Sequence, residues 1–160
     1  MSPAESAAPR PSEGGRAVLR SDGAARGNPG PAAIAYVLLD EHGRELAAEG
    51  RAIGRATNNE AEYHALIAGL ERAAALGLRS LDVRLDSELV VLQLTGRYRV
   101  RSAHLVPLHQ RARALLAGFA ATTIRHVPRG RNARADQLAN TALDAAQGRR
   151  APPGAGQVGK

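Results

Sequence analysis

Four acidic residues in polar motifs, spread over the length of the chain, constrain how it can fold. Asp22, Glu62, Asp86 and Asp136 lie in the runs SDGAARGNPGP, TNNEAEYHAL, LDSELV and HVPRGRNARADQLAN. Carboxylates that converge from four separate elements repel one another, and the arrangement is stable only if cations lie between them. Hard divalent ions such as Mg²⁺ prefer carboxylate and water ligands. The chain therefore predicts a fold whose elements converge on a metal site.

The apolar pattern changes its period near residue 57. Before this point three strand patterns follow one another with short connections, which is typical of an antiparallel meander. After it, helix and strand patterns alternate. We therefore expect an α/β fold, in which helices flank both faces of a mixed five-stranded sheet with three antiparallel strands and then parallel strands. The expected strands are 17–22, 32–40, 45–53, 81–86 and 121–127, and the expected helices are 58–76, 87–94, 107–119 and 132–146.

The length and composition indicate a single domain of roughly residues 16–147. The flanking segments 1–15 and 148–160 are rich in small residues and proline, and we expect them to be disordered tails. The chain has no cysteine, which excludes disulfides and thiolate zinc sites and suits a reducing cytoplasm. Its longest apolar runs, such as 34–39, are too short to span a bilayer. We therefore expect a monomer in the cytoplasm, outside the membrane.

The positive charge is distributed unevenly along the chain. The net charge is +7, carried by 21 Arg and one Lys, and the segment 89–135 holds nine Arg and three His without any Asp or Glu. One interpretation is an arginine-rich proteome in which exposed positions are filled with Arg. The other is a basic surface for a phosphate backbone, because neutralising phosphates and releasing their counterions drives nucleic-acid binding. Beside four candidate metal ligands, the second interpretation makes an acidic polymer the natural substrate.

The second motif contains two acids with different predicted roles. Thr57 and Glu60 have the spacing of a capping box, in which the helix N-cap and the third helical residue bond each other's backbone. Glu60 thus has a structural role at the helix start. Glu62 lies one helical turn before Leu66, on the same face of the helix, and this face should pack against the sheet. A buried carboxylate requires a cation or a proton, so Glu62 is the candidate ligand.

The other three acids each have a structural interpretation as well. Asp22 is expected to end the first strand, where it could be a turn aspartate. Asp86 could cap the following helix, although Ser87 is equally able to do so. Asp136 lies at the rim of the last helix, where aspartates are commonly solvated. His126 ends the fifth strand and could transfer a proton near a metal site, since the side chain titrates close to neutral pH.

These motifs, in this order over residues 17–145, resemble the type-1 ribonuclease H family of the prokaryotic type. The resemblance implies an endonuclease that hydrolyses the RNA strand of an RNA–DNA hybrid with two Mg²⁺ ions, for which Mn²⁺ is a possible substitute. The products would carry 5′-phosphate and 3′-hydroxyl ends. The implied metal ligands are Asp22, Glu62, Asp86 and Asp136.

The resemblance also assigns candidate substrate contacts. The residues implied for the RNA minor groove, where 2′-hydroxyls are displayed, are Gly27, Asn28, Asn58 and Asn59. Thr57 would approach a DNA phosphate, which conflicts with its expected capping role. His126 would assist proton transfer or product release.

One segment departs from many members of the family, which carry a basic, Trp-containing protrusion between the third and fourth acids. Here that region is reduced to TGRYRVRSAHLVP, and the chain has no Trp. Arg97, Arg99 and Arg101 alternate in this segment, so an extended backbone would point all three the same way. We expect these arginines to replace part of the basic protrusion, with Tyr98 as a stacking surface.

Two other functions remain open at this point. A protein of this fold could bind hybrid or structured RNA without cutting it, although the complete set of acids argues against that. It could also be a two-metal nuclease acting on DNA. Asn58, Asn59 and the GNPG loop favour recognition of RNA.

Overall fold

Five strands form one mixed sheet in the order β3-β2-β1-β4-β5. The computed structural model describes residues 16–148. Strand β2 pairs antiparallel with both β1 and β3, whereas β1, β4 and β5 run parallel to one another. The expected α/β fold is confirmed. The strands are β1 (Arg16–Ala25), β2 (Gly30–Leu39), β3 (Glu45–Ala56), β4 (Ser80–Leu85) and β5 (Ala121–His126).

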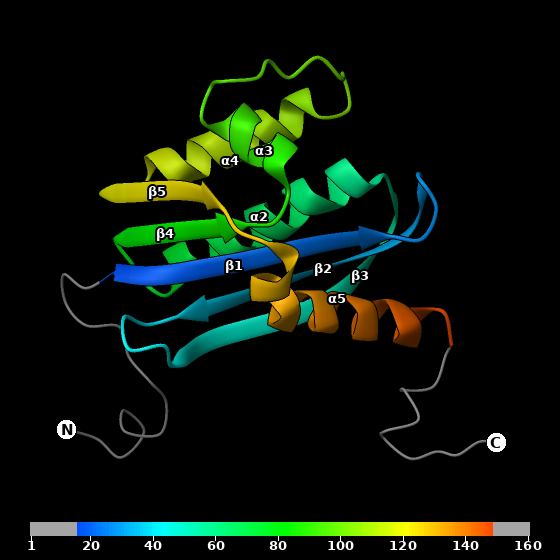
Figure 1. Ribbon diagram of the computed structural model, residues 1–160, viewed down its shortest axis with the longest axis horizontal. Coiled ribbons are helices and arrows are strands. Elements are labelled where there is room, and N and C mark those ends of the chain that lie inside the picture. The colour runs from blue at the N-terminus through cyan, green and yellow to red at the C-terminus, as the bar shows by residue number, and fades with distance from the viewer. Residues whose placement is uncertain (1–15, 149–160) are drawn as a thin grey trace.

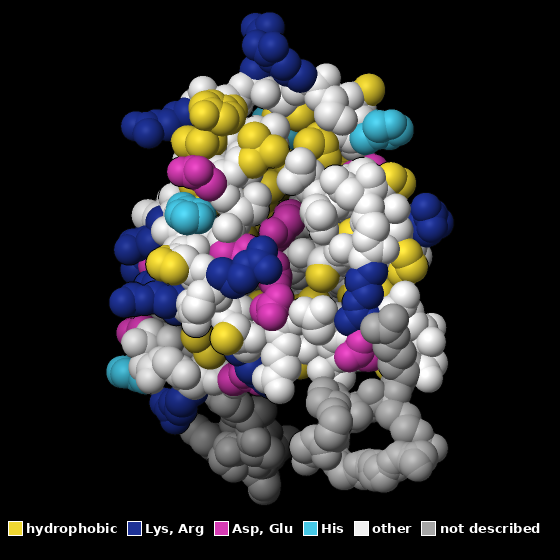
Figure 2. All heavy atoms as spheres, turned by 45° about the vertical axis from the view of Figure 1, so that its right-hand side comes forward, with side chains coloured by type: hydrophobic (Ala, Val, Ile, Leu, Met, Phe, Trp, Pro, Cys, Tyr) yellow, Lys and Arg dark blue, Asp and Glu magenta, His cyan; other side chains and the backbone are white. Residues whose placement is uncertain are grey.

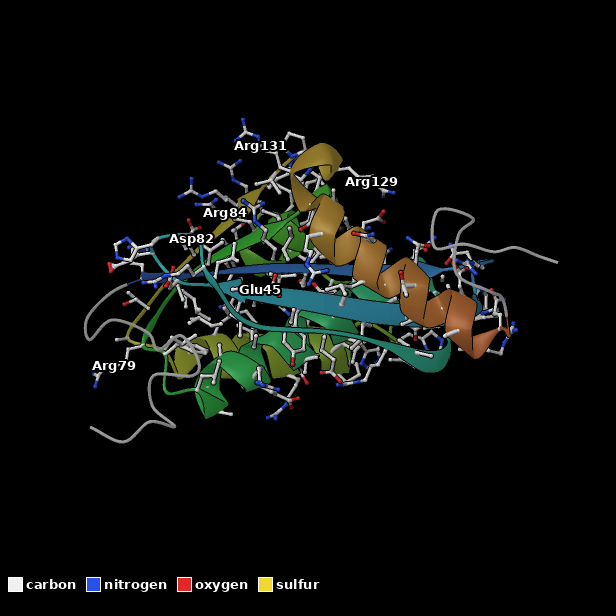
Figure 3. All side chains as sticks on the ribbon, turned by 90° about the horizontal axis from the view of Figure 1, so that it is seen from below. Glu45, Arg79, Asp82, Arg84, Arg129 and Arg131 are labelled. Atoms are coloured by element: carbon white, nitrogen blue, oxygen red, sulfur yellow. The ribbon has the colours of Figure 1, made fainter. Side chains whose placement is uncertain are left out.

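Helices cover both faces of this sheet, as Figures 1 and 3 show. One face carries α2, with α4 packed against α2, and the opposite face carries α5. A short 3₁₀ helix, η1, leads into α5 and was not expected from the sequence. The expected tails lie outside the described residues except for Gly148, which forms a turn after α5. The helices are α2 (Asn58–Ala75), α3 (Glu88–Leu94), α4 (Val106–Ala117), η1 (Arg129–Asn132) and α5 (Ala133–Ala146).

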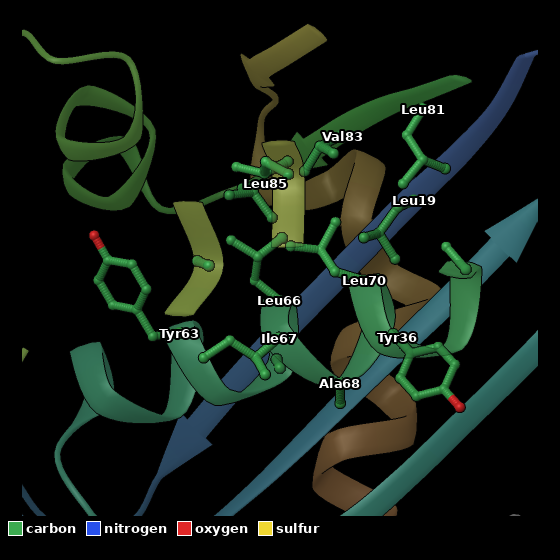
Figure 4. Close-up of a cluster of buried hydrophobic side chains, with 14 of the residues drawn as sticks. Leu19, Tyr36, Tyr63, Leu66, Ile67, Ala68, Leu70, Leu81, Val83 and Leu85 are labelled. Atoms are coloured by element: carbon green, nitrogen blue, oxygen red, sulfur yellow. The ribbon is translucent and has the colours of Figure 1, made fainter. Parts of the chain in front are cut away.

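The main hydrophobic core lies between α2 and the sheet (Figure 4). Leu66 and Leu70 of α2 and Leu19 of β1 have no exposed surface. Gly69 lets the helix approach closely, because a Cβ at this position would lie 2.6 Å from Leu19 Cδ1. Burial of several such side chains, each contributing about 1.5–3 kcal/mol, fixes the position of α2 on β1. No helix within residues 16–148 is long and apolar enough to cross a membrane.

Small residues bring α5 close to the opposite face of the sheet. Ala135 and Ala139 of α5 are buried against Ala35 and Val37 of β2. On β3, a Cβ at Gly50 would lie 2.5 Å from the carbonyl oxygen of Leu138. The helix therefore rests on the backbone of the strand itself, which sets the position of every α5 side chain relative to the sheet.

We predict that Gly50→Ala destabilises the protein by about 1–3 kcal/mol, because the added methyl group forces α5 away from β3. The change should lower the urea midpoint of unfolding and the melting temperature measured by circular dichroism. The matched control is Gly130→Ala, since a Cβ at Gly130 meets no atom within 4 Å. Equal melting temperatures for the two variants would contradict the proposed close contact.

Candidate metal centre

Three of the four candidate acids meet where β1, the start of α2 and the end of β4 come together. Asp22 comes from β1, Glu62 from the first turns of α2, and Asp86 follows the last residue of β4. One carboxylate oxygen from each lies within 4.8 Å of those of the other two. Asp22 is only 3% exposed, and the other two are partly buried. Segments far apart in the sequence therefore deliver like charges to one small volume.

Gly23 makes the approach of Asp22 and Glu62 possible. A Cβ on Gly23 would lie 2.2 Å from the carbonyl carbon of Ala61, so any side chain there would push α2 off β1. The Gly23 amide also donates a hydrogen bond of 3.1 Å to Glu62 Oε1. No sequence signal distinguishes Gly23 from a turn glycine, and the expectation that β1 ends at Asp22 was wrong. Pairing with Ile34 of β2 carries the strand through the Asp-Gly pair to Ala25.

The fourth acid, Asp136, lies in the first turn of α5 beside this cluster. Its carboxyl lies close enough to that of Asp22 to contribute to the raised pKa of Asp22. Asn140, one turn later, donates from Nδ2 to Asp136 Oδ1 at 3.2 Å. The same Asn140 accepts a bond from Arg26, whose guanidinium also pairs with Asp144 at 2.7 Å. A polar network thus connects Asp136 with the loop between β1 and β2.

Asn132 orients the third acid and was also missed. It is 1% exposed, and its Nδ2 donates to Asp86 Oδ2 at 2.9 Å and to the carbonyl oxygen of Ser21 at 2.8 Å. A single polar residue where η1 meets α5 carries no periodic signal, so the contact emerges only from the fold. Asp86 Oδ1 is buried without a protein partner among the described residues. A buried carboxylate oxygen with no donor is the arrangement expected of a cation ligand.

Burial and mutual repulsion hold protons on this cluster. Desolvation, followed by the charges of Glu62 and Asp86, raises the pKa of Asp22 to about 9. Desolvation and the charge of Asp86 raise the pKa of Glu62 to about 8, against the opposing effects of the Gly23 amide and Arg129. The cluster therefore needs protons or cations to be neutralised at neutral pH. Three converging carboxyls, with Asp136 beside them and an unpartnered buried oxygen on Asp86, fit divalent cations, and Figure 2 shows acidic side chains gathered at the centre of one face.

The capping box at the start of α2 is present as expected. Thr57 Oγ1 accepts from the Glu60 amide at 3.1 Å, and Glu60 Oε1 accepts from the Thr57 amide at 2.8 Å. Glu60 is thus occupied at the helix end, and only Glu62 reaches the cluster. The expected conflict for Thr57 is removed, because a hydroxyl that accepts one bond still has its own hydrogen to donate.

The loop between β1 and β2 is bonded to the same helix start. Asn28 Oδ1 accepts from the Asn58 amide at 3.0 Å, and Asn58 Oδ1 accepts from the Ala25 amide at 3.1 Å. Both side chains are exposed, and neither NH₂ group donates to another atom of residues 16–148. Gly27 has a φ of 101°, which favours glycine. Asn59 follows in the first turn of α2, so Gly27, Asn28, Asn58 and Asn59 form one polar rim near Glu62.

The remaining candidate residues form no hydrogen bond or ion pair with the four acids within residues 16–148. His126 ends β5 and is exposed, in register with Leu85, the residue before Asp86. Arg97, Arg99 and Arg101 are exposed in the turns after α3, where no strand forms, so the argument from strand alternation does not apply. Together with Tyr98 they line a shallow hollow of about 430 Å³.

Comparison with known proteins finds close relatives of this chain. Residues 20–142 match the family described as Reverse transcriptase-like. Ribonuclease HI of Halobacterium salinarum is 53% identical over 135 residues, covering 84% of this chain and 68% of that protein. A bifunctional protein of Mycobacterium tuberculosis is 48% identical over 132 residues, covering 82% of this chain, and this chain spans only 36% of its length.

Solved structures agree with these sequence matches. The crystal structure of RNase H1 from Halobacterium salinarum superposes with a TM-score of 0.80, covering 82% of this chain and 99% of that one. LC11-RNase H1, solved in complex with an RNA/DNA hybrid, is 40% identical with a TM-score of 0.78, covering 82% of this chain and 99% of that one.

We predict that, without divalent cations, the protein becomes less stable as pH rises from about 5.5 to about 8.5. The unfolded chain releases the protons of Asp22 and Glu62 near their ordinary pKa values of 3.8 and 4.5, whereas the folded protein keeps them until pH approaches 8 to 9. The folded state therefore binds more protons in this window. Each retained proton lowers the free energy of unfolding by up to about 1.4 kcal/mol per pH unit.

The measurement is the melting temperature across this window with and without a divalent cation. Bound cations should flatten the decline, because they replace the protons. The control is Asp86→Asn, which should also flatten it, since the Asp86 charge raises both pKa values. A melting temperature that rises with pH in the cation-free protein, equally in both forms, would contradict the proposed coupling.

Proposed function

The chain belongs to the type-1 ribonuclease H family, and we propose that it is an endonuclease that hydrolyses the RNA strand of RNA–DNA hybrids with two divalent cations. The observation that carries this proposal is the meeting of Asp22, Glu62 and Asp86 within 4.8 Å, with Asp136 beside them. Cleavage would leave 5′-phosphate and 3′-hydroxyl ends. We also propose that the domain acts as a monomer, since Tyr98 is the one large hydrophobic residue exposed within residues 16–148. A cytoplasmic location is part of the proposal, since a chain without cysteine suits a reducing compartment.

The four carboxylates would hold Mg²⁺, with Mn²⁺ as a possible substitute, because both are hard ions that prefer oxygen ligands. When bound, such ions supply a water of lowered pKa and absorb charge on the leaving oxygen. The chain supplies the positions of the ligands. Gly23 directs Glu62 through its amide, and Asn132 orients Asp86 through its side chain. Rigid support of this kind is needed because small displacements from productive geometry reduce rates strongly.

Recognition of RNA is assigned to the rim formed by Gly27, Asn28, Asn58 and Asn59. The oxygens of Asn28 and Asn58 are bonded inside the protein, so each side chain presents an NH₂ donor outward. Such donors suit the 2′-hydroxyls displayed in the minor groove of a hybrid. Thr57 can donate its hydroxyl hydrogen to a phosphate of the DNA strand while it caps α2.

Two further groups complete the proposed machinery. Arg97, Arg99 and Arg101 would contact the phosphate backbone in place of the family's larger basic protrusion, with Tyr98 as a stacking surface. His126 would transfer a proton or assist product release from its position beside Leu85, the residue before Asp86.

We predict that Glu62→Gln lowers the rate of hybrid cleavage by about a hundredfold or more, because losing a cation ligand displaces the reacting groups. The matched control is Glu60→Gln, two residues earlier, which should retain most activity since Gln also serves in a capping box. Steady-state cleavage of a labelled hybrid measures both. Loss of activity in Glu60→Gln with retention in Glu62→Gln would mean that the wrong acid is assigned to the site.

We also predict that removing the 2′-hydroxyls from the strand to be cut abolishes cleavage. Donors that remain unpaired in the complex lose about 1–3 kcal/mol each, and the register of the strand against the carboxylates is lost with them. The measurement compares a hybrid with the all-DNA duplex of the same sequence over one Mg²⁺ titration. Comparable cutting of both would favour a DNA nuclease, and binding of the hybrid without cutting would favour a binding module.

A further inference from the structure

The sheet face that carries α5 is only partly covered by helices. α5 packs against β1, β2 and β3, and β4 and β5 extend beyond it (Figure 1). The strand register places Arg20 of β1 opposite Arg84 of β4, and Arg84 opposite Arg125 of β5. Because side chains alternate along a strand and Leu19 and Val83 point into the core under α2, these arginines point to the α5 side. They form one arginine row about 10 Å long across three strands.

The arginine row carries more positive charge than its surroundings neutralise. The neighbouring positions on the same face of β1, β4 and β5 contain two acids among the described residues, Asp82 and Asp22, and Asp22 belongs to the carboxylate cluster. Asp82 is shared, since it pairs with Arg84 at 2.8 Å and with Arg125 at 3.3 Å. Arg16, on the same face of β1, donates to Thr123 and adds a further charge.

The row continues to the edge of the metal centre through η1. Arg20 donates a hydrogen bond to the carbonyl oxygen of Arg131, which fixes η1 over the end of β1. Burial and the charges of Arg84 and Arg131 lower the pKa of Arg20, as expected where cations crowd together. Figure 3 shows Arg84, Asp82 and Arg131 on the side of the sheet that carries α5, whereas Arg79 lies at a distant edge.

We propose that the arginine row binds the phosphodiester backbone of a single strand that continues from the bound hybrid past η1, an inference that rests on the proposed function. Surplus arginine charge is complementary to phosphates. The row is also continuous with the carboxylate cluster, which supports this occupant. Arg84 and Asp86 are two residues apart, or about 7 Å along an extended backbone. A duplex has a persistence length of about 150 base pairs and resists bending around a feature as short as η1. A single strand bends much more easily and can follow this path.

The test measures binding of a short blunt hybrid and of the same hybrid with a single-stranded extension at either end, over a range of salt. Glu62→Gln serves as the background so that binding is read without cutting. The main variant adds Asp82→Asn, Arg84→Gln and Arg125→Gln together, because removing the arginines alone would leave the buried Asp82 carboxylate without a cationic partner. The matched control adds Arg55→Gln and Arg79→Gln, two exposed arginines outside the row.

An extension of one polarity should tighten binding and steepen the salt dependence. The main variant should lose this gain in binding. Its slope of log binding constant against log salt concentration should be shallower by about 1.4, the value for two phosphates on a single strand. Asp82→Asn alone should increase the gain in binding, since it removes the acid that pairs with Arg84 and Arg125. The control and the blunt hybrid should show no change. A melting curve of each variant verifies that it is folded.

Several outcomes would overturn the inference. An extension that adds nothing to binding, or an equal loss in the main variant and the control, would mean that the row does not contact the strand. An equal gain from a duplex extension would mean that the assigned occupant is wrong. Failure of the proposed function itself is seen separately, as absent cleavage of the blunt hybrid by the unaltered protein.

Discussion

The backbone contact between Gly23 of β1 and Ala61 of α2 is the constraint on which the metal centre depends. It brings two acids, Asp22 and Glu62, to a separation that their charges oppose. The opposing force comes from the core, where α2 buries Leu66 and Leu70 against the sheet. The hydrophobic effect thus holds an electrostatically unfavourable arrangement in place, and the strain is relieved when cations enter.

A second set of contacts fixes the positions of the third and fourth acids relative to the first. Asn132 bonds both Asp86 and the backbone of Ser21, so the third acid is held relative to the strand that carries the first. Asn140 and Arg26 join Asp136 to the loop that presents Asn28. The proposed cutting and recognition groups therefore belong to one continuous network, and neither is positioned independently of the other.

Much of the fold and of the site was predictable from the sequence, because both depend on local signals. The change in the period of apolar residues near residue 57 predicted the sheet and its helices. The capping box identified Glu60 as a structural residue and left Glu62 as the candidate ligand. What was missed depends on tertiary contacts. Asp-Gly is ordinarily a turn signal, but strand pairing overrides it at Gly23, and Asn132 acquires its partners only when η1 lies over β1. Whether Arg97, Arg99 and Arg101 share one side could not be read from their alternation, because that segment pairs with no strand that would fix its backbone.

The strict alternation along β4 has a consequence for the evolution of this domain. Val83 and Leu85 face the core under α2, whereas Asp82 and Arg84 face the α5 side of the sheet, and Asp86 follows directly. Inserting or deleting one residue in this strand would exchange the two faces, burying charge and displacing Asp86 at the same time. Changes of length are therefore tolerated only between elements, as in the turns after α3. Descendants of this fold can gain or lose whole appendages there while the sheet keeps its residue count.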